Sequence, residues 1–167
     1  MVLELAVLAV FPALMAFAGA MDLFTMTIPN RVPLALVVIF FALAPFMGFD
    51  LLTLGQHVAV AAGTLVLGLF CFARGWIGGG DAKLFSATAL WLGWEHLFEY
   101  TLVAAILGGL LTLVILFGRM MPLPAPLARQ DWLARLHDTR QGVPYGIALA
   151  AGALLVYPHT AWMQLAG

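Results

Sequence analysis

Long apolar runs dominate this chain of 167 residues and restrict it to folds that a lipid bilayer can surround. Hydrophobic residues make up 64% of the sequence and charged residues only 9%, against about 25% charged residues in an average soluble domain. A helix needs about 20 apolar residues to cross the hydrocarbon core of a membrane. Such runs occupy residues 2–21, 32–49, 53–73, 80–94, 97–118 and 143–165. The sequence therefore predicts an all-α membrane protein, a polytopic bundle of about six transmembrane helices.

The runs follow one another without repeats or low-complexity tracts, and we expect residues 1–167 to form a single integral-membrane domain. The first run ends in Ala18-Gly19-Ala20, which resembles the cleavage site of a signal peptide. However, Glu4 stands where a signal peptide carries positive charge, and no Lys or Arg precedes the run. We therefore expect the first helix to be retained.

Basic residues predict how the chain is oriented in the membrane. Six of the seven lie in the first, third and fifth connections between runs: Arg31, Arg74, Arg119, Arg129, Arg135 and Arg140. The other connections carry Asp50, Glu95 and Glu99, and neither end of the chain has Lys or Arg beyond the runs. The positive-inside rule then makes the odd-numbered connections cytoplasmic and places both termini outside.

The connection 119–142 has a composition of its own. It opens with Met121-Pro122-Leu123-Pro124-Ala125-Pro126, which favours a stiff, extended backbone. Residues 127–139 then interleave Trp132 and leucines with arginines and aspartates, a pattern typical of an interfacial helix lying on the cytoplasmic leaflet. A solvated connector is the alternative.

The sequence offers no cofactor or metal site. Cys71 is the only cysteine, so the chain forms neither an internal disulfide nor a CxxC zinc motif. The four histidines are scattered over both sides of the predicted membrane: His57, His96, His137 and His159. Nucleotide-binding loops, haem motifs and basic nucleic-acid-binding patches do not occur. We therefore predict no metal, no cofactor and no nucleic-acid partner.

Two acids at the ends of apolar runs, Asp22 and Asp81, are the strongest functional candidates. Ionisable groups in or beside lipid are costly, which marks them as functional. The predicted topology places both acids at the cytoplasmic face. A carboxylate pair can hydrolyse an amide when one ionised acid activates water and one protonated acid polarises the scissile carbonyl. We therefore predict an aspartyl-protease dyad.

Other interpretations of these residues stay open. Gly78, Gly79 and Gly80 precede Asp81 and would let an extended substrate approach the backbone, but they also suit a plain loop. Asp81 is equally suited to cap the following helix, and Asp22 to reach water at a membrane boundary. A small transporter or channel component would use such acids to bind a cation or relay protons. A structural subunit of a pilus or secretion assembly is a further alternative.

Three ordered motifs carry a family resemblance. Residues 78–84 have the sequence Gly-Gly-Gly-Asp-Ala-Lys-Leu, Asp22 is followed by Ile28-Pro29-Asn30, and Val143-Pro144-Tyr145-Gly146 opens the last run. These elements resemble the GxGDxKL, aspartate-IPN and PYG motifs of the type IV prepilin peptidases, membrane aspartyl proteases that trim pilin precursors. GxGD alone is a weak signal, whereas three motifs in order across residues 22–146 are specific.

The resemblance implies that Asp22 and Asp81 are the catalytic pair. It implies supporting or substrate-binding roles for the motif residues around them: Gly78, Gly79, Gly80, Lys83, Pro29, Asn30, Pro144, Tyr145 and Gly146. The implied reaction removes a short basic leader, usually after glycine, from a pilin-like precursor with an apolar helix. That reaction takes place at the cytoplasmic face of the bacterial inner membrane. The other partners that it implies are membrane lipid and components of a pilus or secretion assembly.

Two differences from the larger members of that family refine the expectation. Those members carry an N-terminal cytoplasmic region with paired CxxC motifs, linked to N-methylation of the new amino terminus. Here the first run begins at residue 2 and Cys71 is alone, so we expect the short form that serves Flp/Tad-type pili, without methyltransferase activity. Residues 23–27 also lack the basic side chains common in the family, so the first helix is free to run deeper before Pro29.

Overall fold

The computed structural model describes residues 2–166, with side chains over 7–163, and this range contains helices and no strand. In chain order the elements are α1 (Val2–Thr25), α2 (Arg31–Leu43), η1 (Ala44–Met47), α3 (Leu51–Ala73), α4 (Gly79–Arg119), α5 (Ala125–Ala128), α6 (Asp131–His137), α7 (Tyr145–Val156), η2 (Tyr157–His159) and α8 (Ala161–Ala166). The predicted all-α membrane bundle is confirmed.

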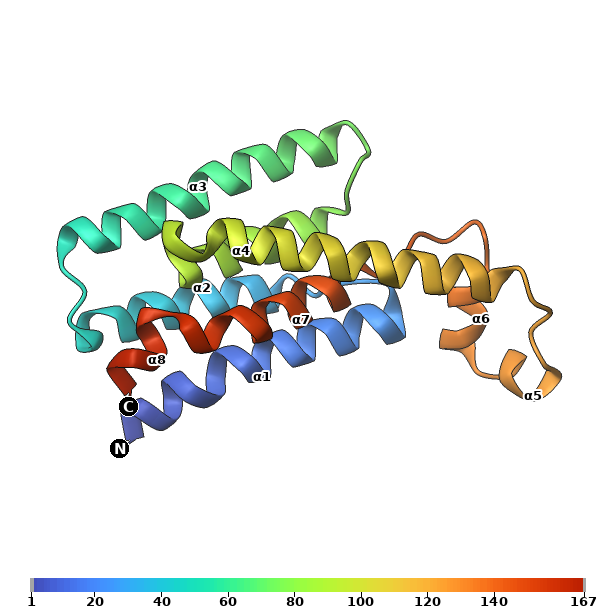
Figure 1. Ribbon diagram of the computed structural model, residues 1–167, viewed down its shortest axis with the longest axis horizontal. Helices are drawn as coiled ribbons and strands as arrows, with labels where there is room; N and C mark the ends of the chain where they lie inside the picture. The colour runs from blue at the N-terminus through green and yellow to red at the C-terminus, as the bar shows by residue number, and fades with distance from the viewer. Residues whose placement is uncertain (1, 167) are drawn as a thin grey trace.

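Helix α4 is two helices joined by a reversal. Its 41 residues are interrupted at Gly93, where φ is 68° and ψ is −175°. The rings of Phe85 and Tyr100 stack with centroids 5.2 Å apart, although one continuous helix would separate these residues by about 22 Å. The first limb (79–92) and the second limb (94–119) therefore run antiparallel, as Figure 1 shows. The turn that we expected at Glu95–His96 thus lies slightly earlier in the chain.

With α4 divided in this way, the apolar helical segments follow the six predicted runs. Helices long and apolar enough to cross a membrane occur at Val7–Thr25, Leu51–Ala73 and Gly79–Arg119. Two shorter apolar segments, Arg31–Met47 and Tyr145–His159, match the second and sixth runs. The second limb of α4 is about 39 Å long at 1.5 Å per residue, more than the roughly 30 Å of a hydrocarbon core. Its end therefore extends beyond α1 toward α5 and α6 (Figure 1).

We predict that replacing Gly93 with alanine destabilises the protein. The backbone at this position is in a region that glycine alone adopts readily, and a Cβ would lie 2.8 Å from the His57 ring. The expected loss is about 1–3 kcal/mol of unfolding free energy, measured by thermal denaturation in detergent. Gly109→Ala on the second limb is the control, because its Cβ would meet nothing within 4 Å. Equal stability of the two variants would contradict the prediction.

The core is built around Trp91, near the end of the first limb. Its indole nitrogen donates a hydrogen bond to the Leu36 carbonyl of α2 at 2.9 Å, and the Trp162 indole of α8 donates to the Trp91 carbonyl at 2.8 Å. The Phe11 ring of α1 lies 5.1 Å from Trp91. Because these partners come from three other elements, Trp91 fixes the reversed limb at the centre of the bundle.

Helix α3 lies at the periphery and packs on the first limb (Figure 1). A Cβ on Gly68 would lie 3.0 Å from the Ala82 Cβ, so the two backbones are in close contact there. Nearer the other end of α3, the Ser86 hydroxyl donates to the Ala61 carbonyl at 2.7 Å. Asp50 caps the start of α3, where hydrogen bonds from the side chain and backbone of Thr53 lower the pKa of Asp50.

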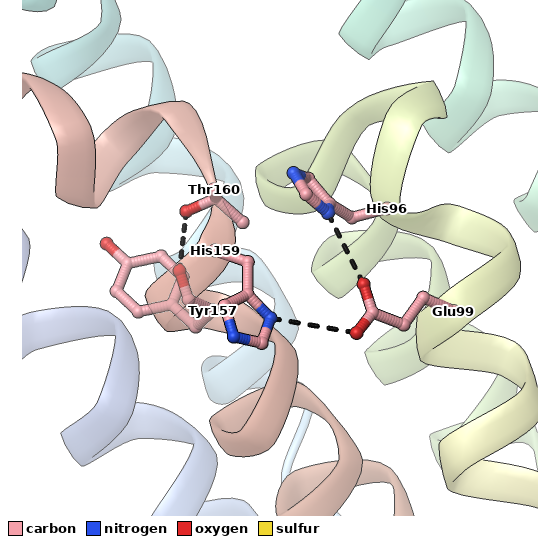
Figure 2. A network of polar contacts seen from close by, with 5 residues as sticks. All are labelled: His96, Glu99, Tyr157, His159 and Thr160. Atoms are coloured by element: carbon pink, nitrogen blue, oxygen red, sulfur yellow. Dashed lines mark hydrogen bonds and ion pairs between the residues drawn. The ribbon is translucent and has the colours of Figure 1, made fainter.

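A small polar network ties η2 to the start of the second limb. Glu99 has one carboxylate oxygen 3.6 Å from Nδ1 of His96 and the other 3.6 Å from Nδ1 of His159. Figure 2 shows these contacts beside the hydrogen bond from Thr160 to the Tyr157 carbonyl. The network lies near the reversal at Gly93, at the end of the bundle opposite to Asp81.

The connection 119–142 differs from the single helix that we expected. Residues 127–139 are divided between α5 and α6, with a break at Arg129 and Gln130. The segment also docks on the bundle. Arg135 donates to the Phe24 carbonyl at 2.6 Å, and the rings of Trp132 and Phe24 meet edge to face at 5.6 Å. These contacts hold the segment at the end of α1.

Candidate active site

Asp22 lies in the last turn of α1 and is buried, with 5% of its surface exposed. Its Oδ2 accepts a hydrogen bond from the backbone N–H of Gly146 in the first turn of α7, at 2.7 Å. Helix α1 continues to Thr25 and ends where Met26 takes a left-handed conformation with φ of 55°. The helix thus ends well before Pro29, and Asp22 is held inside the bundle.

Asp81 lies in the first turn of α4, three residues after the N-cap Gly78. Its carboxylate reaches back to the Gly78 backbone, an arrangement like that of the acidic residue in a capping box. A Cβ on Gly78 would lie 2.7 Å from Asp81 Oδ2, so a larger residue would displace the carboxylate. Asp81 is partly buried.

Both carboxylates line one cavity of about 890 Å³. Its walls come from the end of α1, the second half of α3, both limbs of α4, the start of α7 and the loops before α4 and α7. The other lining residues are Met26, Thr64, Leu67, Gly68, Cys71, Gly75, Trp76, Ile77, Gly78, Ala82, Phe85, Thr101, Gln141, Gly142, Val143, Pro144, Tyr145 and Leu149. Two acids separated by 59 positions in the sequence therefore share a mostly apolar cavity.

Ile28 brings the three sequence motifs together. A Cβ on Gly80 would lie 3.2 Å from the Ile28 Cβ, and one on Gly146 would lie 2.8 Å from the Ile28 Cδ1. The Ile28 side chain, which is buried, thus packs between the start of α4 and the start of α7. Since Asp22 and Asp81 belong to the joined segments, this packing fixes the placement of both acids. The sequence motif Ile28-Pro29-Asn30 includes this residue. However, the packing role of Ile28 depends on contacts with Gly80 and Gly146, which are distant in the sequence.

The three glycines before Asp81 have different surroundings. Gly78 has an extended backbone and lines the cavity. Gly79 and Gly80 belong to the first turn of α4, where a Cβ on Gly79 would meet the Phe72 ring at 3.2 Å. Of the three, only Gly78 lies in the loop before the helix. Gly79 and Gly80 instead permit close packing against α3 and Ile28.

The PYG residues lie at the start of α7 beside Asp22. Pro144 is the N-cap of α7, and both Pro144 and Tyr145 line the cavity. The Tyr145 hydroxyl is 3.0 Å from the Thr112 hydroxyl of the second limb, and the ring packs against Gly108. Tyr145 thus anchors the start of α7 to α4, while Gly146 supplies the hydrogen bond to Asp22.

Lys83 and Asn30 form a polar contact at the surface. The Lys83 ammonium donates to Asn30 Oδ1 at 2.9 Å, both side chains are exposed, and Pro29 beside them is partly buried. This contact joins the IPN loop to α4. It indicates that Lys83 supports the geometry of the site from outside the cavity.

A double-mutant cycle tests that supporting role. We expect Lys83→Met and Asn30→Ala each to lower the unfolding free energy, and the pair to show a coupling of about 0.5–1.5 kcal/mol, the range of one net hydrogen bond. Thermal denaturation of the four proteins in detergent measures it. Additive effects would show that the contact contributes nothing, and the exposed Arg74→Met change is a control for loss of a surface cation.

Two arginines make contacts that their neighbours in the sequence do not predict. Arg119, at the end of α4, donates to the carbonyls of Leu136, Gln141 and Gly142 at 2.7, 3.2 and 3.0 Å. Arg135 binds the Phe24 carbonyl, two residues after Asp22. The sequence signalled these residues only as basic charges. Together they hold the connection 119–142 against the segments that carry Asp22 and Gly146.

Among the side chains that the structure describes, those of residues 7–163, no group of three or more His, Cys, Asp or Glu is arranged to hold a metal ion. The ionisable groups that line the cavity are two carboxylates in mostly apolar surroundings, Asp22 beside the start of α7 and Asp81 beside the N-cap Gly78 of α4.

Comparison with known proteins points to one family. The model of the type IV leader peptidase family matches residues 9–113, a range that includes both acids. A prepilin leader peptidase/N-methyltransferase of Bacillus subtilis (strain 168) is 30% identical over 156 residues, which cover 93% of this chain and 56% of that protein. A protein of the same name from Pectobacterium carotovorum subsp. carotovorum is 31% identical over 118 residues, covering 68% and 42%.

A third relative of that name, from Burkholderia pseudomallei (strain K96243), is 41% identical over 71 residues, covering 41% of this chain and 23% of that protein. The chain thus spans at most about half the length of the curated relatives that it matches. No solved structure matches it significantly.

Proposed function

Because this chain belongs to the type IV leader peptidase family, we propose that it is a membrane aspartic endopeptidase that removes the leader from pilin-like precursors. The observation that supports this most directly is the shared cavity of Asp22 and Asp81. In this proposal the two acids are the catalytic residues. We further propose that the protein is the short, Flp/Tad-type form of the family and that the leaders it removes are basic.

The carboxylate pair suits amide hydrolysis. Two carboxylates that share a site do not ionise together easily, so the pair tends to hold one proton. The ionised acid takes a proton from water, whose oxygen attacks the scissile carbonyl carbon while the protonated acid donates to the carbonyl oxygen. Collapse of the tetrahedral intermediate breaks the C–N bond, and the amine leaves with a proton from the pair. The products are a leader with a free carboxylate and a mature protein with a free amine.

The contacts around the acids support preorganisation of this reaction. The Gly146 N–H holds one oxygen of Asp22, and Gly78 is held beside the Asp81 carboxylate. Fixed carboxylates lose little further freedom in the transition state, which favours catalysis. Under this proposal Gly78, Pro144 and Tyr145 contact the substrate, because they line the cavity. The other motif residues, Lys83 and Asn30 among them, act as positioning residues.

The orientation that we propose places the cavity at the cytoplasmic face of a bacterial inner membrane, with both termini outside. Four of the seven basic residues lie in or at the end of the connection 119–142, and Arg135 binds beside Asp22. The positive-inside rule assigns such a segment to the cytoplasm. Leaders with basic residues would meet the site on that side, and pilus or secretion assembly components are further partners under the same proposal.

Cleavage of a purified precursor tests the proposed function. Membranes containing this protein are incubated with a pilin-like precursor, and mass spectrometry identifies the new amino terminus of the product. We expect cleavage between the leader and the apolar segment. Methylation of that terminus, which we do not expect, would appear in the same spectrum. An intact precursor under conditions where the protein is folded would contradict the proposal.

A further inference from the structure

The attachment of α3 leaves one of its faces turned to the cavity. Its contacts with the first limb follow one line along the helix: Gly68 with Ala82, Ala61 with Ser86, and Nδ1 of His57 with the Leu90 carbonyl at 2.6 Å. Thr64, Leu67, Gly68 and Cys71 of α3 line the cavity beside this line of contacts. Across the cavity lie Thr101 of the second limb and Leu149 of α7. We call the space between these two walls the α3 cleft.

The α3 cleft reaches the surface of the bundle. Leu67 lines the cavity and is 61% exposed, and Tyr145 lines it and is 43% exposed. Leu67 lies within a 23-residue helix that is long and apolar enough to cross a membrane. A surface at this depth faces lipid rather than water, so the cleft opens sideways into the bilayer.

The charged groups of the cleft are confined to one end of it. The wall away from the acids consists of Leu67, Phe85 and Leu149 together with two threonines. The Thr64 hydroxyl donates to the Val60 and Ala61 carbonyls, and the Thr101 hydroxyl donates to Leu97. Because these hydroxyl protons are already used, this wall suits an apolar occupant.

Toward the acids the lining gains charged and backbone polar groups beside apolar side chains such as Met26, Trp76 and Ile77. Asp22, Asp81 and Gln141 lie there with the backbone of Gly75, Gly78 and Gly142. A substrate helix satisfies its own backbone hydrogen bonds and can lie between apolar walls in lipid, whereas an unwound segment needs polar partners. Along α3 the cleft offers apolar walls that suit a helix. At the carboxylates it offers the polar partners that an unwound segment needs.

We propose that the α3 cleft receives the apolar transmembrane segment of the substrate directly from the bilayer, with the scissile bond at the polar end. This inference rests on the proposed function, because it names where the precursor of that reaction lies. The peptide next to the scissile bond unwinds beside Gly78, and the leader extends past Gln141 and Gly142. Thr101 and Leu67 are then specificity-determining residues for the apolar segment.

Photocrosslinking from Cys71 tests the occupant. Cys71 is the only cysteine of the chain and lines the cleft, so a benzophenone maleimide attaches there alone. The full-length protein carries Asp81→Asn, which keeps bound precursor intact. We expect crosslinks to the apolar segment of a pilin-like precursor. A Cys71→Ser, Val66→Cys protein is the control, because Val66 is 69% exposed on another face of α3, and it should crosslink to lipid.

Crosslinks from Cys71 to the leader alone, or to lipid alone in the presence of precursor, would overturn the inference. This readout does not require cleavage. The crosslinking result can therefore contradict the α3 cleft as the binding site without contradicting the proposed function. The proposed function is contradicted only when the unmodified enzyme leaves the precursor intact.

A kinetic experiment tests the same cleft in the active protein. We expect Thr101→Trp to fill the cleft and raise KM for the membrane-embedded precursor about tenfold or more, with kcat nearly unchanged. Leu102→Trp is the matched control, since Leu102 is 50% exposed beside it on the same helix. A KM equal to that of the control, or a loss confined to kcat, would contradict access through the cleft.

Discussion

Replacing either Asp22 or Asp81 with asparagine should abolish leader removal, with a loss of at least about a thousandfold in cleavage rate. Asparagine has nearly the same shape as aspartate but neither takes a proton from water nor donates one as an acid. In the Asp22→Asn protein, the side-chain amide oxygen would still accept a hydrogen bond from Gly146, so the contact between α1 and α7 is retained. The measurement is the fraction of precursor processed by membranes containing each variant.

The control separates loss of chemistry from loss of structure. Asp50→Asn changes an acid at the opposite end of the bundle, and asparagine remains a good N-cap, so cleavage should stay normal. Thermal denaturation in detergent should show all three variants folded. Cleavage that persists in either Asp22→Asn or Asp81→Asn would reject the dyad while leaving the family assignment intact.

Gly146→Ala is expected to have the second largest effect, a loss of about a hundredfold in cleavage rate. Its Cβ would lie 2.8 Å from Asp22 Oδ2 and 2.8 Å from the Ile28 Cδ1. Both distances are too short, so either α7 or Asp22 must move. A shift of about 1 Å at a reacting group is enough for a loss of this size. The measurement is kcat for precursor cleavage, because a displaced carboxylate affects the chemical step.

Gly63→Ala is the matched control for this change. Gly63 lies in α3, and a Cβ there would meet nothing within 4 Å. This variant should cleave normally and be at least as stable as the unmodified protein, since alanine favours helix over glycine by about 1 kcal/mol. Normal cleavage by Gly146→Ala would mean that the close approach of α7 to Asp22 and Ile28 is not needed for the reaction.

Local patterns were sufficient to predict the class of fold. Apolar runs of about 20 residues have few alternatives to a membrane helix, because backbone polar groups in lipid must be satisfied within the segment. The turn between the fourth and fifth runs was misplaced by a few residues, because Trp94 and the residues after it continue as helix directly from Gly93. The reversal of α4 depends on the conformation of Gly93, whereas we placed the turn at Glu95 and His96 because these residues are polar.

The helix expected over residues 127–139 was only partly right for a related reason. Its composition favours helix, but the structure divides it into α5 and α6. Trp132 packs against Phe24, and Arg135 binds a carbonyl at the end of α1. These contacts come from residues more than 100 positions away, so a periodicity within the segment could not reveal them.

The membrane class, the apolar runs and the two acids could be predicted from the sequence, because each depends on residue type and on neighbours within a few turns. The shared cavity of Asp22 and Asp81, the packing of Ile28 between the three motifs and the hydrogen bond from Gly146 to Asp22 instead depend on how the helices pack. Positions 22 and 146 are 124 residues apart, and their contact depends on how α1, α4 and α7 pack. Helix packing is set by the shapes of whole faces, which no single motif records.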